Sequence, residues 1–196
     1  PGCCIDLSET KENGEPWDLA NDDDIREFEA LHEKEDPEFL VGTPPCQVFS
    51  QLFHIGKRLR DPAKDAVKIE IGRKHLRTSV RAYRRQMERD TLFLHEHPDP
   101  ASSWYEKEMK ELTDDPRVYR VKGPLRRWNL KMHDEEGEGY VRKMSGYATN
   151  SKKLAQLLDA MCSNDTGKRP WHRHVRLTPG SGRAYLAREH PPALVN

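Results

Sequence analysis

The chain has 196 residues, of which 34% are charged and 35% hydrophobic, and 33 basic and 33 acidic residues give a formal net charge of +0. This length suits one domain with a core, and the apolar share argues against wholesale disorder. No apolar run approaches the roughly 18 residues of a membrane span, no segment resembles a signal peptide, and four cysteines are too few for a disulfide framework. We therefore expect an intracellular protein with no membrane partner, in a reducing compartment.

The even charge balance conceals two segregated segments. Residues 1–38 hold 3 Lys or Arg and 14 Asp or Glu, whereas residues 57–89 hold 12 basic and 4 acidic residues. Two interpretations stay open: the segments neutralise each other in the fold, or the basic segment forms a surface for nucleic acid.

The first predicted elements are a strand and a helix. Cys3–Leu7 is a short apolar run that contains an acid, and a turn with a glycine follows it. Asp6 is either a carboxylate that accepts hydrogen bonds from the ribose of a cofactor or an ordinary strand-end acid. A helix then begins at Asn21 or Asp22 and ends near residues 36–37, with one apolar face: Ile25, Phe28, Leu31.

The central predicted feature is a strand that ends at a cysteine loop. Phe39–Val41 form the apolar run of a buried parallel strand, and Gly42, a residue free of φ limits, ends it. Two prolines stiffen the exit and hold Cys46 at the carboxyl end of the strand, where open α/β sheets bind ligands. A short helix over Val48–Phe53 would lower the pKa of the Cys46 thiol.

A long helix and a second strand follow. The helix is predicted from Ala63 to about Arg89, and its apolar residues repeat at helical spacing: Val67, Ile71, Val80, Tyr83, Met87. Leu92–Leu94 read as the next buried strand, with Glu96 two residues past its end. A helix between two buried strands implies a parallel pair with a right-handed connection, so Cys46 and Glu96 should meet at one edge.

The remaining elements are shorter. We expect a helix from Ser102 or Ser103 through Leu112, a strand over Arg117–Val121, a hairpin of Leu130–His133 with Gly139–Met144, and a helix from Ser151 through Met161 with Leu154, Leu157 and Leu158 inward. These elements assign residues 1–162 to one α/β domain and residues 163–196 to a loosely ordered basic tail.

Two of these segments carry a resemblance to a known family. The run G-T-P-P-C-Q-V-F-S closely resembles the P-P-C-Q-x-F-S signature of the cytosine-5 DNA methyltransferases, with matches at Cys46, Gln47, Phe49 and Ser50. Further on, T-L-F-L-H-E-H-P resembles the strand that precedes Glu-Asn-Val in that family, where Glu96 matches and His97 and Pro98 differ.

The resemblance implies a fold, a reaction and a cofactor. The fold would be a Rossmann-like methyltransferase sheet, mostly parallel with an antiparallel hairpin at its edge and without its first strand. The reaction would be methylation of cytosine in DNA by S-adenosylmethionine, with Cys46 as the nucleophile on C6 and Glu96 on the N3 side of a flipped base. The nucleus suits such a substrate.

The resemblance also implies binding residues. Asp6 and Pro44 would contact the cofactor, and Gln47 and Ser50 the substrate. Basic side chains after the cysteine loop would bind the phosphates that flank the flipped base: Lys57, Arg58, Arg60.

Three alternatives stay open. The sequence lacks the Gln-x-Arg motif and a target-recognition region, and so resembles the reduced methyltransferase-like modules of mobile-element polyproteins; such a module would be inactive and bind nucleic acid or protein. A second alternative is that Cys46 is only a small residue that fills the turn at the end of the strand. Alternatively, the pairs His95/His97 and His172/His174 hold a metal, with Cys46 or His54 nearby, in a metal-dependent hydrolase.

Overall fold

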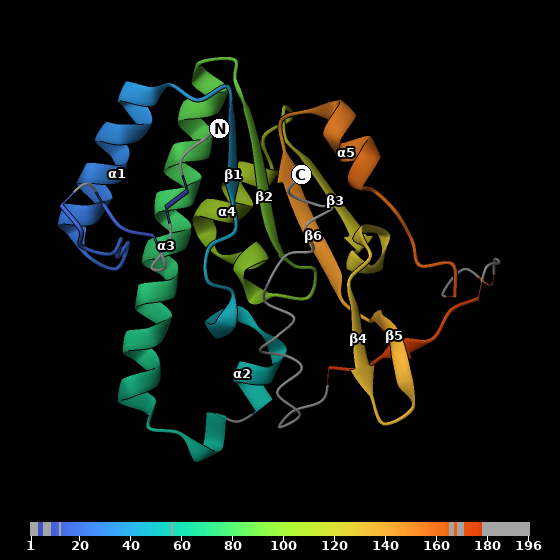
Figure 1. The fold of residues 1–196 in the computed structure, drawn as a ribbon. Helices are drawn as coiled ribbons and strands as arrows, with labels where there is room; N and C mark the ends of the chain where they lie inside the picture. Colours follow the sequence, from blue (N-terminus) through green and yellow to red (C-terminus); the bar gives the residue numbers. More distant parts are fainter. Residues whose placement is uncertain are drawn as a thin grey trace.

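A computed structural model describes residues 4–5, 9–11, 13–55, 57–164, 167 and 171–177. Figure 1 shows their arrangement. The helices are α1 (Asp22–Glu35), α2 (Gln51–Ile55), α3 (Pro62–Glu88), α4 (Lys107–Thr113) and α5 (Lys152–Leu158), with 3-10 turns η1 (Gln47–Phe49), η2 (Lys57–Leu59), η3 (Ser102–Tyr105) and η4 (Leu125–Trp128). The strands are β1 (Phe39–Gly42), β2 (Leu92–Pro98), β3 (Tyr119–Pro124), β4 (Lys131–Asp134), β5 (Gly137–Val141), β6 (Met144–Thr149) and β7 (His174–Val175).

The strands form two mixed sheets. In the four-stranded sheet, with order β1-β2-β6-β3, the β1 and β2 pair is parallel, and the β2–β6 and β6–β3 pairs are antiparallel. This sheet is therefore mixed rather than mostly parallel. The predicted hairpin is confirmed as β4 and β5, but it lies in a separate sheet of order β4-β5-β7 instead of at the edge of the first. The fold class is α/β.

Helices cover both faces of the four-stranded sheet. The main core lies between this sheet and α3 with α4, and its largest buried side chains include Tyr83, Phe93 and Leu112. On the opposite face, Leu94 and Tyr147 pack against Leu158 of α5. Because side chains alternate along a strand, neighbouring residues of β2 enter different layers.

The acidic and basic segments pair with each other. Helices α1 and α3 lie side by side (Figure 1), and ion pairs join residues about 52 positions apart, so the two helices run in the same direction. The pairs are Asp22–Lys74 at 2.7 Å, Glu29–Arg81 at 2.8 Å, Glu33–Arg85 at 4.0 Å and Asp36–Arg89 at 2.7 Å. Of the two interpretations of charge, mutual neutralisation is the one found on this helix face.

Several predicted elements differ in extent or burial. The edge strand β1 leaves Phe39 44% and Val41 49% exposed, because no described strand covers its outer side. Val67 and Ile71 are exposed, since the amino-terminal half of α3 extends beyond the sheet (Figure 1). Helix α5 ends at Leu158 rather than near Met161, and Leu157 points outward.

Two predictions lie at the ends of the described chain. The predicted strand Cys3–Leu7 falls largely outside the described residues, and Cys4 and Ile5 are not in a strand. His174–Val175, which fall within the predicted tail, form β7 and pair with β5. None of the helices in the described ranges is long and apolar enough to cross a membrane.

Candidate functional site

The cysteine loop leaves β1 beside β2. The parallel register places Gly42 opposite His95, so the loop that follows Gly42 runs next to the end of β2. Nε2 of His97 donates a hydrogen bond to the carbonyl oxygen of Pro44 at 2.8 Å, and its Nδ1 lies 2.6 Å from Oγ of Ser103. The side chain of His97 therefore fastens the cysteine loop to the second strand. His97 stands where the family has asparagine.

Gly42 is needed for space rather than for its backbone angles. Gly42 belongs to β1 and does not have a positive φ, contrary to the role we expected from its conformational freedom. A Cβ atom at this position would overlap the hydroxyl of Tyr83. That hydroxyl lies 3.0 Å from Nδ1 of His95, the residue opposite Gly42. The glycine lets a buried tyrosine reach a buried histidine.

Cys46 directly precedes η1 and is half-buried. Phe49 of η1 is buried and its ring lies 6.0 Å from that of His97, while Gly72 of α3 gives Val48 room to approach. The predicted helix after the cysteine is confirmed, but as the three-residue η1 followed by α2 of five residues. Cys46 thus sits at the carboxyl end of β1, as predicted.

The two predicted substrate ligands near Cys46, Gln47 and Ser50, differ in their exposure and hydrogen bonding. Gln47 is exposed. Oγ of Ser50 donates to the carbonyl oxygen of Gln47 at 2.8 Å and accepts from the backbone N–H of Phe53 at 3.2 Å. The hydroxyl of Ser50 therefore stabilises the turn between η1 and α2.

Glu96 lies inside β2 rather than past its end. The strand continues to Pro98, and Glu96 is only 6% exposed. Its carboxylate accepts a hydrogen bond from Oγ of Ser145 on the neighbouring β6. Strand alternation puts Glu96 in the layer of Leu94, whereas His95 and His97 face α3. The structure brings β1 and β2 together as predicted. Phe49, from the cysteine loop, and Glu96 lie on opposite faces of the sheet.

The three predicted phosphate ligands do not act alike. Lys57 and Arg58 are exposed on η2. Arg60 is instead an internal anchor: its Nε lies 2.9 Å from Oδ2 of the buried Asp65, and its guanidinium stacks 4.1 Å from the centre of the Phe53 ring. The charge of Arg60 is therefore already paired within the chain, and its contact with a phosphate stays a prediction.

The predicted cofactor residues do not form a visible site. Asp6 lies outside the described residues. The carbonyl oxygen of Pro44 already accepts the hydrogen bond of His97. A cavity of about 160 Å³ lies between α1 and α3, against Glu29, His32 and Arg81, on helices rather than at the strand ends. Of the two predicted cofactor residues, the described part of the chain therefore places only Pro44.

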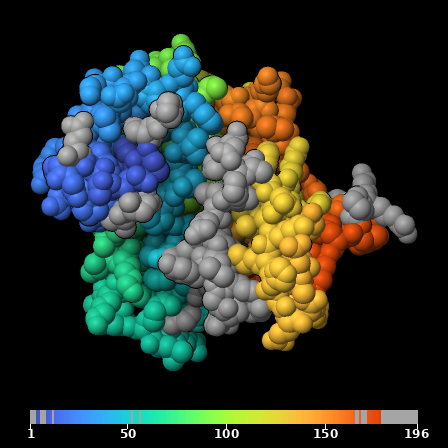
Figure 2. Space-filling view, in the orientation of Figure 1, coloured from blue at the N-terminus to red at the C-terminus, as the bar shows by residue number. Residues whose placement is uncertain are grey.

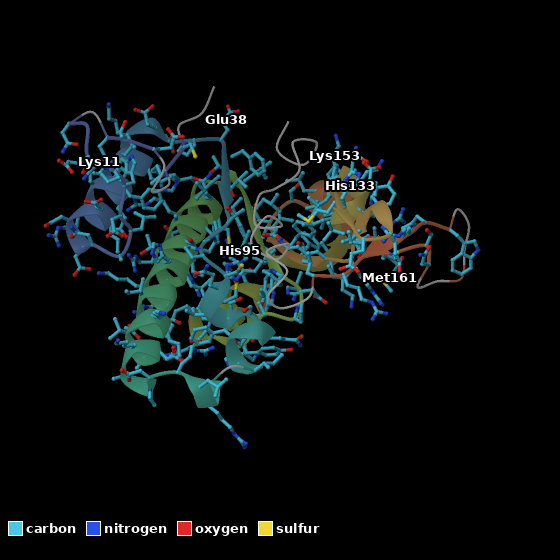
Figure 3. The ribbon with its side chains drawn as sticks, turned by 60° about the horizontal axis from the view of Figure 1, so that its bottom comes forward. Lys11, Glu38, His95, His133, Lys153 and Met161 are labelled. Carbon is cyan, nitrogen blue, oxygen red and sulfur yellow. The ribbon has the colours of Figure 1, made fainter. Side chains whose placement is uncertain are left out.

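The two histidine pairs do not join in one metal centre. His95 and His97 are buried, and burial lowers the pKa of both rings, which favours their neutral form. Both nitrogens of His97 take part in hydrogen bonds. Figure 3 shows His95 in the middle of the molecule, and Met161, next to Cys162, in the part that holds the small sheet. The predicted metal centre built from both pairs is therefore wrong.

The structure adds residues that the sequence reasoning missed. Cys162 lies 3.4 Å from Nε2 of His172 and 3.3 Å from Nε2 of His174. Tyr83, Ser103 and Ser145 hold the polar side chains of β2. The spacing C-x9-H-x-H was a signal for the first group, whereas no local pattern marks the second.

Comparisons were made with models of protein families, with curated proteins and with solved structures, and none gave a match to this chain.

Proposed function

We propose that the chain is a cytosine-5 DNA methyltransferase-like module, in which Cys46 forms a covalent bond to a cytosine base and Glu96 contacts the N3 side of its ring. The observation that carries this proposal is the parallel register of β1 and β2, which puts the P-P-C-Q loop beside the strand of Glu96. The hydrogen bond from His97 to Pro44 holds the loop there. Together, β1, α3 and β2 would form one βαβ unit of a Rossmann-like methyltransferase sheet.

The chemistry of addition needs only the thiolate and the base. The Cys46 thiolate forms a bond from its sulfur to C6, and the electron pair of the C5–C6 double bond moves to C5. C5 then takes a proton from water; loss of the original C5 hydrogen and expulsion of the thiolate restore the ring. In the family, S-adenosylmethionine supplies a methyl group to C5 instead, and we propose it as cofactor on the resemblance alone.

The first test uses hydrogen exchange, since exchange does not require the methyl donor. Single-stranded DNA with tritium at C5 of cytosine is incubated with the full chain, and release of tritium into water is measured. We expect release that Cys46→Ser abolishes and that Cys4→Ser, a change at an exposed cysteine, leaves unchanged. Release that persists in Cys46→Ser would rule out this nucleophile.

Trapping then tests the covalent bond itself. DNA that contains 5-fluorocytosine, offered with S-adenosylmethionine, should give an adduct that is stable to denaturation and absent in Cys46→Ser, because fluorine at C5 cannot leave as a proton does. Glu96→Gln should reduce the adduct, with Ser145→Ala as the control for loss of the neighbouring hydrogen bond. Exchange without an adduct would support the nucleophile and reject methyl transfer.

An inactive module that binds a protein is the second candidate. The basic residues of α3 that pair with α1 are not free for nucleic acid, which disfavours the long basic surface. Large apolar side chains at the other end of the molecule are exposed instead: Ile55 77%, Leu59 93%, Val67 61%. If the wild-type chain gives no tritium release and no adduct, the enzyme is rejected and the inactive module remains as the candidate.

A further inference from the structure

The second notable cluster is formed by one cysteine and two histidines near the small sheet. Cys162 follows α5 and is 3% exposed, while His174 is the first residue of β7 and His172 lies two residues before it. Three distances close a triangle: Sγ of Cys162 to Nε2 of His172 is 3.4 Å, Sγ to Nε2 of His174 is 3.3 Å, and the two Nε2 atoms are 3.0 Å apart.

Hydrogen bonds alone do not account for this triangle. An imidazole nitrogen has one in-plane position, which holds either a hydrogen or a lone pair. Each Nε2 contacts the other two atoms of the triangle through this one position. The three contacts therefore cannot all be full hydrogen bonds at once. A cation at the centre uses the lone pairs of all three atoms together.

The dimensions suit zinc. Bonds of about 2.1 Å to nitrogen and about 2.3 Å to sulfur at tetrahedral angles separate two nitrogens by about 3.4 Å and a nitrogen from sulfur by about 3.6 Å. The observed separations of 3.0, 3.3 and 3.4 Å are each within about 0.4 Å of these values. Thiolate with imidazole is also a ligand set that zinc prefers and that magnesium and calcium do not.

Neighbouring residues orient His172. Its Nδ1 lies 3.5 Å from Oγ of Ser163, which leaves Nε2 directed toward Cys162. The side chain of Asn164 donates to the carbonyl oxygen of His172 at 2.7 Å, and the ring of Tyr140 meets the imidazole edge-on at 5.5 Å. Contacts of this kind fix the tautomer and the ring orientation of metal-binding histidines.

We propose that Cys162, His172 and His174 supply three of the four ligands of a zinc ion with a structural role. The ion would join the segment after α5, which packs on the four-stranded sheet, to β7 of the small sheet. The yellow to red part of the surface in Figure 2 is the lobe that it would hold. This site is separate from Cys46 and does not depend on the proposed reaction.

Metal analysis of the purified full chain is the first test. We expect one zinc per chain after dialysis, and cobalt substituted for zinc should give the visible bands of a tetrahedral site with a near-ultraviolet thiolate band. Cys162→Ser, His172→Gln and His174→Gln should each weaken zinc binding by at least about 100-fold, more than the loss of a neighbouring contact costs. The matched controls are Cys46→Ser and His133→Gln, which should keep the metal.

Two measurements keep the proposal open to refutation. Cys162→His offers a nitrogen in place of sulfur and should retain zinc while losing the thiolate band of cobalt. Removal of zinc by a chelator should lower the thermal midpoint of the wild-type chain but not that of Cys162→Ser. A chain that binds no zinc at micromolar concentration, or a folded Cys162→Ser that binds it as tightly as the wild type, would overturn the site.

Discussion

The same H-x-H spacing occurs within β2 and at the start of β7, and it has two different outcomes. In β2, His95 and His97 lie under α3 in the main core and meet a hydroxyl or a backbone carbonyl. At β7, His172 and His174 lie beside a thiol. Alternation along β2 puts His95 and His97 on one side of the strand, and the Nε2 atoms of His172 and His174 lie 3.0 Å apart. The residues that face each pair then decide its chemistry. In the buried pair His97 fastens the cysteine loop, whereas the pair beside Cys162 is arranged for a cation.

The largest expected effect on stability comes from disrupting the contact between Tyr83 and His95. Gly42→Ala should destabilise the protein by about 3 kcal/mol, because the new methyl group would displace the Tyr83 hydroxyl from His95. Urea unfolding of both proteins measures the change. Thr43→Ala, at the exposed neighbour of Gly42, is the control and should cost far less. Equal stabilities for wild type and Gly42→Ala would show that Tyr83 does not occupy this place.

A smaller effect should follow from deleting the hydroxyl itself. Tyr83→Phe leaves Nδ1 of His95 buried without its partner, at a cost of about 2 kcal/mol. In a double-mutant cycle with His95→Leu, the two changes together should cost less than the sum of the single changes, since neither partner then remains unsatisfied. Additive costs would mean that this hydrogen bond contributes nothing to stability.

The third prediction concerns the pH dependence of stability, which tests whether the buried histidines of β2 stay uncharged in the folded protein. The pKa of His95 is held well below 6.5 and that of His97 is lowered, mainly by burial, so the unfolded chain binds protons that the folded protein does not. Stability should therefore be full above about pH 6.5 and fall as the pH drops, by about 1.4 kcal/mol per pH unit for each histidine.

Chemical unfolding at pH 7.5, 6.5 and 5.5 measures this dependence. His95→Leu should reduce the slope by about one proton. The slope that remains would come from His97 and from His32 and His75, whose pKa values burial also lowers. An unchanged slope in His95→Leu would show that this ring is protonated in the folded protein.

Local patterns predicted many of the elements. The helical spacing from Val80 to Met87, the capping residue Asn21 and the apolar run before Gly42 gave α3, α1 and β1 with boundaries close to those observed. The apolar run before Glu96 gave the start of β2, but the strand extends four residues further, to Pro98. The parallel pairing of β1 with β2 followed from the helix between them. These features depend on residues that are near one another in the chain.

Pairing across the chain was less predictable. The sequence does not show that β6 separates β2 from β3, and the mostly parallel sheet was implied by the resemblance to the methyltransferase family. Arg60 looked like a phosphate ligand because its partner Asp65 lies on a different element. Cys162 was passed over because the histidines, 10 and 12 residues further on, were assigned to a loosely ordered tail.

The sequence by itself determined the helices, the parallel unit around α3, the cysteine loop and its resemblance to the methyltransferase signature. Only the tertiary structure decided which histidines lie in the core, that Gly42 makes room for Tyr83, and that three donor atoms converge beside β7. The physical reason is the distance along the chain over which each interaction acts. Helix propensity, capping and alternation act over a few residues, whereas burial and donor convergence depend on side chains that only the folded chain brings together.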